Sequence, residues 1–300
     1  MIPTFPQYKK LELTDRELIK SFMQEYPPYS DFNFVSLWSW DTKGEAQLST
    51  INKNLVVRLT DYVTGQPCYS FLGNDNLTET INTLLRFIQK EESCSHFLKL
   101  IPEECLPQVK SNDFVIEEDR DNFDYLYEVD KLRTFQGSNF ERLRTQKNRF
   151  LRENKNIKVI NLDLKNPTDR KIVLELNQQW EVNKGHVLEN EESALTRILF
   201  PTNDFNLLNI GIFVDNAPVA FSISEVLENH YAISHFVKAD INYPGVYSYL
   251  MSVNADALSL RGCSLLNYEQ DLGIEGLRKA KLAFRPLKYL RKYIVKSMIS

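Results

Sequence analysis

The stretch from residue 207 to residue 238 decides the fold class and reads LLNIGIFVDNAPVAFSISEVLENHYAISHFVK. Its apolar residues alternate or run in three segments, Leu207 to Val214, Pro218 to Leu227 and His230 to Lys238, as β-strands do. The intervening pairs Asp215-Asn216 and Glu228-Asn229 suit tight hairpin turns, since Asn and Asp tolerate left-handed backbone. The stretch therefore predicts three strands in a hairpin arrangement.

The segments around these strands complete a recognisable order. Two helical patterns precede them, at Asn166 to Asn183 and Leu188 to Leu199. After them come a helix at Tyr247 to Leu260, a strand at Ser264 to Tyr268, a helix at Ile274 to Leu282 and a strand or loop at Tyr289 to Ile294. This is the order of the GNAT acyltransferase fold, and the first half shows it in a shorter form. We predict an α/β (α+β) fold of two tandem GNAT-like domains, residues 1–120 and 121–300. Each is expected to be a mixed, mostly antiparallel sheet flanked by helices.

Composition narrows the class of protein. The chain has 300 residues, of which 43% are hydrophobic, and a net charge of −4, so it can bury sizeable cores and has no overall charge that favours nucleic acid. Its four cysteines lack a CxxC spacing and its four histidines lack a metal-ligand spacing, so we predict reduced thiols and no metal site. No apolar run is long enough to span a bilayer, and no leader peptide is evident. We expect a soluble cytoplasmic protein.

Basic residues are concentrated in one predicted helix, Phe140 to Asn154. Between Arg142 and Lys158 there are seven bases and one acid. Such a surface can bind the phosphates of tRNA, although a solvated helix has the same composition. The candidate nucleic-acid-binding residues are Arg142, Arg144, Lys147, Arg149 and Arg152.

A second dense stretch, from Asn267 to Lys281, reads NYEQDLGIEGLRKAK. It has the pattern of a strand end, a tight turn and a helix start, where ligands commonly bind in α/β folds. Alternation along the strand end is expected to point Glu269 and Asp271 into one cleft. Arg278 and Lys281 are three residues apart on one helical face and could hold a phosphate or a carboxylate. Salt bridges between these acids and bases are the structural alternative.

Several motifs together resemble the family of the phosphatidylglycerol lysyltransferase C-terminal domain. They are FVSLW at residues 34–38, DYLY at 124–127, FERLRTQKNRF at 140–150, HFVKA at 235–239, and the stretch 267–281 followed by Pro286. The resemblance covers nearly the whole chain and includes short stand-alone bacterial members of unassigned function. It implies two GNAT-like domains related to the Fem-type transferases, which use aminoacyl-tRNA. Lysyltransferase members move an aminoacyl group from charged tRNA to a lipid headgroup.

With this resemblance, the candidate catalytic residues are Glu269, Asp271 and Lys238. The candidate substrate-binding residues are Asn267, Arg278, Lys281, His235, Gly245 and Tyr247. The place where a GNAT enzyme holds coenzyme A carries only Pro244-Gly245 and no GxG, which disfavours acetyl-CoA in the standard manner.

Two classes of function remain open on the sequence alone. The first is an acyl- or aminoacyl-transferase in which Glu269 or Asp271 takes a proton from an amine or hydroxyl acceptor, and backbone N–H groups or Lys238 stabilise the oxyanion. The donor would be aminoacyl-tRNA if the basic helix is used, or acyl-CoA if the Pro244-Gly245 turn is used, and the acceptor a small molecule or a lipid headgroup. The second is a non-catalytic binding or regulatory protein that keeps the fold. The oligomeric state is not predicted.

Overall fold

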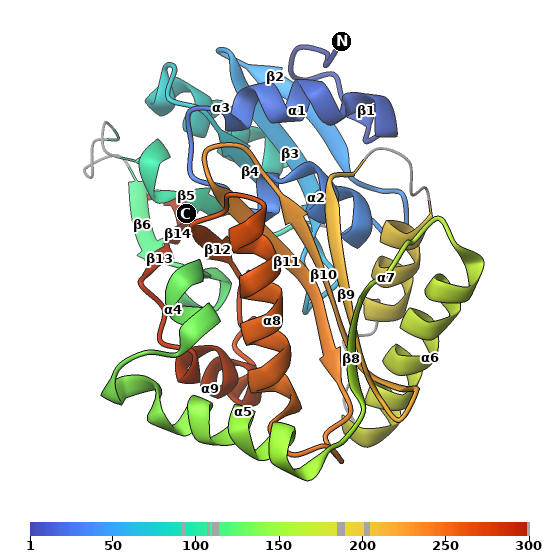
Figure 1. The fold of residues 1–300 in the computed structure, drawn as a ribbon. Coiled ribbons are helices and arrows are strands. Elements are labelled where there is room, and N and C mark those ends of the chain that lie inside the picture. The colour runs from blue at the N-terminus through green and yellow to red at the C-terminus, as the bar shows by residue number, and fades with distance from the viewer. Residues whose placement is uncertain (92–93, 107–108, 110–113, 185–189, 201–204, 299–300) are drawn as a thin grey trace. The chain divides into compact units, whose positions relative to one another are not determined.

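The computed structural model describes residues 1–91, 94–106, 109, 114–184, 190–200 and 205–298 (Figure 1). The chain forms two compact units. The first comprises Met1–Asp124, Gln270–Ile274 and Tyr289–Ser300, and the second comprises Tyr125–Glu269 and Glu275–Lys288. The first unit thus includes two C-terminal segments that the sequence-based boundary at residues 120 and 121 assigned to the second domain.

The first unit is built on a seven-stranded sheet in the order β1-β2-β3-β4-β5-β14-β6. Its neighbours are antiparallel except for β4 and β5, which are parallel and joined through the helix α3. The strands are β1 (Lys9–Lys10), β2 (Gln47–Ile51), β3 (Asn54–Thr60), β4 (Pro67–Leu72), β5 (Leu98–Pro102), β6 (Phe114–Glu118) and β14 (Lys292–Ser297). The described helices are α1 (Arg16–Met23), α2 (Phe34–Trp40) and α3 (Leu77–Ile88).

The second unit is built on a sheet in the order β13-β7-β12-β11-β10-β9-β8. Strands β8 to β11 form antiparallel pairs, β12 is parallel to β11, and β7 is antiparallel to β12. The strands are β7 (Asp124–Glu128), β8 (Ile157–Asn161), β9 (Leu207–Val214), β10 (Ala217–Val226), β11 (Tyr231–Ala239), β12 (Leu265–Asn267) and β13 (Lys288–Leu290). The described helices are α4 (Val129–Thr134), α5 (Glu141–Glu153), α6 (Pro167–Lys184), α7 (Glu191–Leu199), α8 (Val246–Leu260) and α9 (Glu275–Ala283).

The two sheets share one plan. Each has five strands in chain order, the last two parallel and joined by a helix, and then one strand inserted before the final edge strand. The inserted strand is β14 in the first sheet and β7 in the second. If the chain is divided into two halves of seven strands, the seventh strand of each half completes the sheet of the other. The prediction of two GNAT-like domains with mixed, mostly antiparallel sheets is therefore confirmed.

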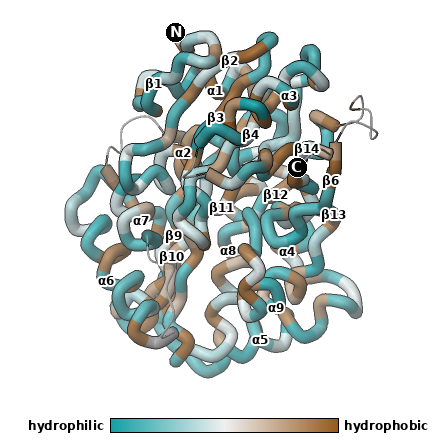
Figure 2. Tube along the Cα trace, turned by 180° about the vertical axis from the view of Figure 1, so that it is seen from behind, coloured by the Kyte–Doolittle hydropathy of each residue, from teal (hydrophilic) through white to brown (hydrophobic). Residues whose placement is uncertain are grey.

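Helix α8 is fixed on the second sheet by a buried polar network. Asn254 of α8 accepts hydrogen bonds from Ser222 (3.1 Å) and Ser224 (3.3 Å) and donates to Ser234 (3.3 Å). All four side chains are buried, and such groups are tolerated only when they are paired. Figure 2 shows hydrophobic residues along the strands of this sheet and a largely hydrophilic α5. Because these hydrogen bonds form in only one arrangement, the network fixes the position of α8 on the sheet more tightly than apolar packing alone would.

Most predicted elements of the second half are confirmed, including the three hairpin strands, the basic helix and the helix after Gly245. Three regions of the chain differ from the prediction or were left unassigned. The aromatic segment near Phe34 forms the short helix α2, and α4 was not predicted. The sequence pattern also predicts a short helix from Pro102 to Lys110; its described residues form a single 3-10 turn at Glu103–Cys105, and the rest of the range lies partly outside the described residues.

A buried ion cluster fixes β14 in the first unit. The Lys292 ammonium forms ion pairs with Asp31 and, at 2.7 Å, with Asp124, and all three side chains are fully buried. Ser30 donates to Asp124 through both its hydroxyl (2.7 Å) and its backbone N–H (2.8 Å). Burial raises the pKa of Asp31 to about 6, against the opposing effect of Lys292. The two aspartates raise the pKa of Lys292 although burial alone would lower it.

We predict that Lys292→Ala lowers the free energy of unfolding by about 3–5 kcal/mol, because it leaves two buried carboxylates without their cation. Urea unfolding followed by circular dichroism measures the loss. The control is the triple variant Lys292→Met, Asp31→Asn, Asp124→Asn, which removes the charges together and should recover most of the stability. Equal losses in both proteins would show that the charge pairing does not hold β14.

Candidate active site at the separation of β11 and β12

The parallel strands β11 and β12 separate after a short paired region. Their register runs from Tyr231↔Leu265 to Ile233↔Asn267. Strand β12 ends there, whereas β11 continues to Ala239. Beyond the last pair, one edge of β11 has no β12 neighbour, and the carboxyl ends of diverging parallel strands are a common place for ligands.

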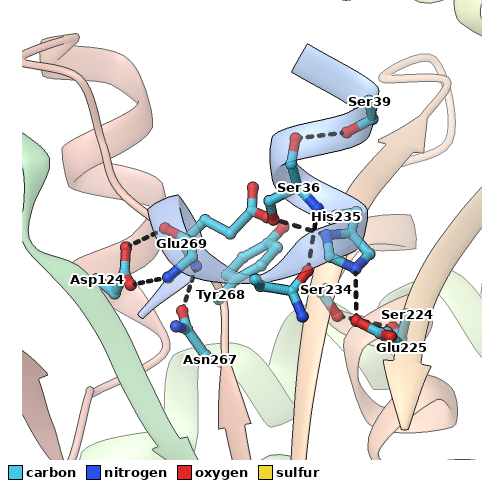
Figure 3. A network of polar contacts seen from close by, with 12 residues as sticks. Ser36, Ser39, Asp124, Ser224, Glu225, Ser234, His235, Asn267, Tyr268 and Glu269 are labelled. Carbon is cyan, nitrogen blue, oxygen red and sulfur yellow. Dashed lines mark hydrogen bonds and ion pairs between the residues drawn. The ribbon is translucent and has the colours of Figure 1, made fainter. Parts of the chain in front are cut away.

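A β-bulge places His235 at this separation. The register with β10 changes from Ile223↔Phe236 to Ser224↔Ser234, so His235 is the extra residue of β11. Bulges redirect a side chain and are frequent next to active sites. The bulge brings the His235 ring between two carboxylates, as Figure 3 shows for Glu225 and Glu269.

The position of Glu269 depends on an unusual backbone conformation. Its φ of 55° is left-handed, which a residue with a side chain rarely adopts. The Glu269 N–H donates to the Asn267 side chain (2.7 Å), and its carbonyl accepts from the Tyr125 N–H (3.1 Å). Lys281, which is buried, donates to the carbonyl of the preceding Tyr268. Asn267 and Lys281, both predicted to bind substrate, therefore hold the backbone that presents Glu269.

The pair His235 and Glu269 carries complementary charge. Glu269 Oε1 lies 3.1 Å from His235 Nδ1, and Glu225 Oε2 lies 3.7 Å from Nε2. The His235 side chain is 1% exposed, and burial alone would lower its pKa, yet the two carboxylates raise it to about 9. The ring is therefore an imidazolium at neutral pH. The Glu269 side chain is 14% exposed, so the carboxylate keeps access to a ligand.

The first unit offers an internal comparison. Its parallel strands β4 and β5 are paired at Tyr69↔Leu98, and the residues two positions further on are Phe71 and Leu100. Leu100 has φ 60°, close to that of Glu269. Both side chains are buried and apolar. The same backbone plan thus occurs twice, but only the second unit has His and Glu at these positions.

A second cluster lies near the C-terminal end of β11, a few residues beyond His235. The Lys238 ammonium forms an ion pair with Glu191 (2.6 Å) and lies 3.2 Å from the centre of the Trp180 ring. The Trp180 Nε1–H donates to the Tyr247 hydroxyl (2.9 Å). Two predicted site residues, Lys238 and Tyr247, are therefore linked through Trp180. Burial raises the pKa of Tyr268, and the nearby Tyr247 and Glu269 raise it further. Tyr268 therefore lies near both Tyr247 and Glu269.

Gly245 has a structural reason for being glycine. Its φ is 88°, and a Cβ there would lie 2.0 Å from the carbonyl oxygen of Gln146 in α5. The same contact is strengthened by a hydrogen bond from Ser248 to the Gln146 side chain (3.0 Å). The role of Gly245 in binding substrate remains a prediction; in the structure the α5 backbone lies where its side chain would begin.

Asp271 does not share the environment of Glu269. The predicted alternation fails because β12 ends at Asn267 and Glu269 is left-handed. Asp271 belongs to the first unit, where it is fully buried, forms an ion pair with Arg120 (3.2 Å) and accepts from the Gly273 N–H (2.9 Å). Arg278 lies half-buried on α9. Asp271 as a catalytic group and Arg278 as a ligand-binding group remain predictions.

The basic helix α5 has residues of two kinds. Arg144 donates to the carbonyl oxygens of Phe135 and, at 2.6 Å, Gly137, and Lys147 donates to Ser252 (2.7 Å). These two side chains hold α5 in the second unit. Arg149 and Arg152 are 51% and 73% exposed; Arg149 forms an ion pair with Glu153 (2.8 Å), and Arg152 lies 3.8 Å from the same carboxylate. Arg142 is also exposed. The exposed residues are thus the better candidates for binding phosphate.

Sequence reasoning named neither Glu225 nor Trp180 as a site residue. Glu225 stands near a strand end before a turn, where a charged residue is ordinary, so its spacing carried no signal. In the part of the chain that the structure describes, no group of three or more His, Cys, Asp or Glu side chains could hold a metal ion. Among the described helices, none combines the length and apolar character needed to cross a membrane.

The second unit thus combines a GNAT-like fold with a charged pair, His235 and Glu269, at the point where β11 and β12 separate. The model of the family "Phosphatidylglycerol lysyltransferase, C-terminal" matches residues 24–296, so the chain belongs to this family. A crystal structure of a conserved protein of unknown function from Bacteroides thetaiotaomicron VPI-5482 is similar, with a TM-score of 0.82 and 26% identity over 99% of this chain and 100% of that one.

More distant structures share the fold. L-PGS from Bacillus licheniformis has a TM-score of 0.64 and 14% identity over 97% of this chain and 94% of that one. The structure of FemX has a TM-score of 0.57 and 10% identity over 96% and 95%. An uncharacterized protein of Mycoplasmoides gallisepticum (strain R(low / passage 15 / clone 2)) is 27% identical over 189 residues, which is 61% of this chain and 58% of that protein's length.

The raised pKa of His235 predicts a specific pH dependence of stability. A group whose folded pKa is about 9 and whose unfolded value is 6.5 stabilises the folded state fully below pH 6.5, and this contribution is lost as pH rises through 9. We expect the free energy of unfolding to fall by roughly 3 kcal/mol between pH 6 and pH 10 from this group. Urea unfolding across this range measures it. In His235→Gln the decline should be smaller by that amount, and an unchanged slope would contradict the assignment.

Proposed function

We propose that the chain is an acyl- or aminoacyl-transferase whose reaction takes place where β11 and β12 separate. One observation carries the proposal: the partly exposed Glu269 carboxylate is held 3.1 Å from the buried His235 imidazolium, two residues beyond the last strand pair. Membership of the lysyltransferase C-terminal family supports the reaction class.

The chemistry assigns one proton to Glu269. The carboxylate takes the proton of the acceptor's amine or hydroxyl as the acceptor attacks the carbonyl carbon of the donor. The bond from carbon to the acceptor forms, the carbonyl oxygen becomes an oxyanion, and collapse breaks the donor's ester or thioester bond. The leaving alcohol or thiol then receives the proton from Glu269. His235 fixes the carboxylate and offsets its charge throughout.

An aminoacyl-tRNA donor agrees better with the geometry than acyl-CoA. Coenzyme phosphates bind most readily to free N–H groups at a helix start. At the start of α8, the Gln146 carbonyl of α5 lies where a Gly245 Cβ would be, so this approach is crowded. The outer face of α5 presents exposed arginines suited to an RNA backbone. The acceptor is a small amine or hydroxyl compound or a lipid headgroup.

Glu269→Gln tests the proposed base, because the amide keeps the size of the side chain and cannot take a proton. We expect kcat to fall by about 10²–10⁴-fold. Transfer is measured with radiolabelled aminoacyl-tRNAs and acyl-CoAs against small amines and phosphatidylglycerol vesicles. The control, Glu275→Gln, changes a carboxylate that is 81% exposed and should leave the rate unchanged. Unchanged turnover in Glu269→Gln would remove Glu269 from the mechanism and favour a binding role for the protein.

Charge reversal on α5 tests the tRNA interaction. We expect the double variant Arg149→Glu, Arg152→Glu to weaken tRNA binding and to reduce the slope of log K against log salt by about 1 for each lost phosphate contact. Fluorescence anisotropy with labelled tRNA at several salt concentrations measures both. The control is the pair Lys171→Glu and Lys279→Glu made together, at positions 74% and 73% exposed on α6 and α9, which changes the net charge by the same amount. If the double variant and the control bind alike, the exposed face of α5 is only solvated.

A further inference from the structure

The Tyr247 hydroxyl has an unusual set of hydrogen bonds. Its oxygen accepts from the Trp180 Nε1–H (2.9 Å) and from the Ala239 backbone N–H (3.3 Å). Both partners can only donate, so both lone pairs of the phenolic oxygen are engaged. Its own proton must point away from them, and no acceptor for it occurs among the residues that the structure describes.

Tyr247 contacts the part of β11 that extends beyond the strand separation. Ala239 is the last residue of β11, on the part of the strand that has lost its β12 neighbour. Tyr247 and Glu269 both add to the rise in the pKa of the half-buried Tyr268, so both lie near that side chain. A donor with a fixed oxygen and a free proton is therefore present in the region that contains the carboxylate.

The phenol is held in its protonated form. Burial is the largest influence on the pKa of Tyr247 and raises it, the two hydrogen bonds that it accepts act in the opposite direction, and the charge of Glu191 raises it further. The net effect is a raised pKa, so Tyr247 donates a hydrogen bond but does not give up its proton near neutral pH.

We propose that Tyr247 is a catalytic residue whose O–H donates to the carbonyl oxygen of the transferred acyl group. The proposal rests on the proposed transferase function and adds an electrostatic component to it. As the acceptor attacks, the carbonyl oxygen becomes an oxyanion and the Tyr247 hydrogen bond to it strengthens. The acceptor's proton goes to Glu269 and then to the leaving group, so Tyr247 begins and ends the cycle protonated.

Trp180 and Lys238 act through Tyr247 as positioning residues. Trp180 fixes the direction of the Tyr247 proton by occupying one lone pair of its oxygen. The Lys238 ammonium lies over the Trp180 ring and is anchored by Glu191. Lys238, predicted from the sequence to stabilise the oxyanion directly, is instead proposed to orient the tyrosine that does so.

The test compares Tyr247→Phe with Tyr249→Phe in the transfer assay. Tyr247→Phe removes one oxygen and should lower kcat by about 10²–10³-fold while KM changes little, because the lost interaction forms in the transition state. Trp180→Phe should lower kcat less, by roughly 10-fold, since the donor remains but its direction is no longer fixed. Tyr249 is on the same helix, with its ring stacked on Phe150, and its variant should keep the wild-type rate.

The outcomes separate this proposal from the function on which it rests. Circular dichroism and thermal unfolding first establish that each variant is folded. If Tyr247→Phe turns over like the wild type while Glu269→Gln is inactive, the role of Tyr247 is overturned and the transferase function stands. If both tyrosine variants lose the same activity, the loss is not specific to Tyr247 and the proposal also fails. If the wild type transfers nothing from any donor, both proposals fall together.

Discussion

The ion pair between Lys292 and Asp124 is the contact on which the architecture depends. Lys292 opens β14 and Asp124 opens β7, which are the two strands that each sheet takes from the other half of the chain. Removing these charges from water costs several kcal/mol per ion, and the cost is offset only because Asp31 and Ser30 complete the pairing. Without β14, both β5 and β6 would have an unpaired edge. The first sheet is therefore complete only when the last residues of the chain are in place.

The two sheets share one plan but carry different residues where their parallel strands separate. In both units the pairing of the parallel strands stops after a short register, so one edge of each strand loses this neighbour. In the first unit the positions beyond the pair are filled by Phe71 and Leu100, which exclude water and stabilise the core. In the second unit the equivalent positions hold His235 and Glu269, whose burial is tolerated because their charges are opposite. Burying His235 and Glu269 stabilises the fold less than an apolar pair would. This supports the assignment of the pair to function.

The sequence predicted the fold better than the site, and the residues show why. Strands and helices follow local periodicity, so the segments around β9 to β11 and α8 could be read directly. The insertion of β14 into the first sheet depends on contacts between distant residues and leaves no local pattern. Glu269 and Asp271 looked equivalent because strand alternation was assumed, whereas the left-handed φ of Glu269 ends that alternation. The role of Glu225 follows from a bulge in β11, which a single sequence does not reveal.

The close contact between α5 and α8 limits how any donor can engage the second unit. Glycine at position 245 is required because the α5 backbone lies where a side chain would begin, and Arg144 and Lys147 hold α5 in that place. The start of α8 is thus used for packing within the fold. For the proposed reaction, contacts with the donor then have to come from side chains, from Tyr247 and Glu269 at the reacting group and from the outer arginines of α5 along a polyanion. One helix thus carries both half-buried, hydrogen-bonded bases and exposed ones: the first kind fixes the helix, and the second kind is proposed to bind phosphate.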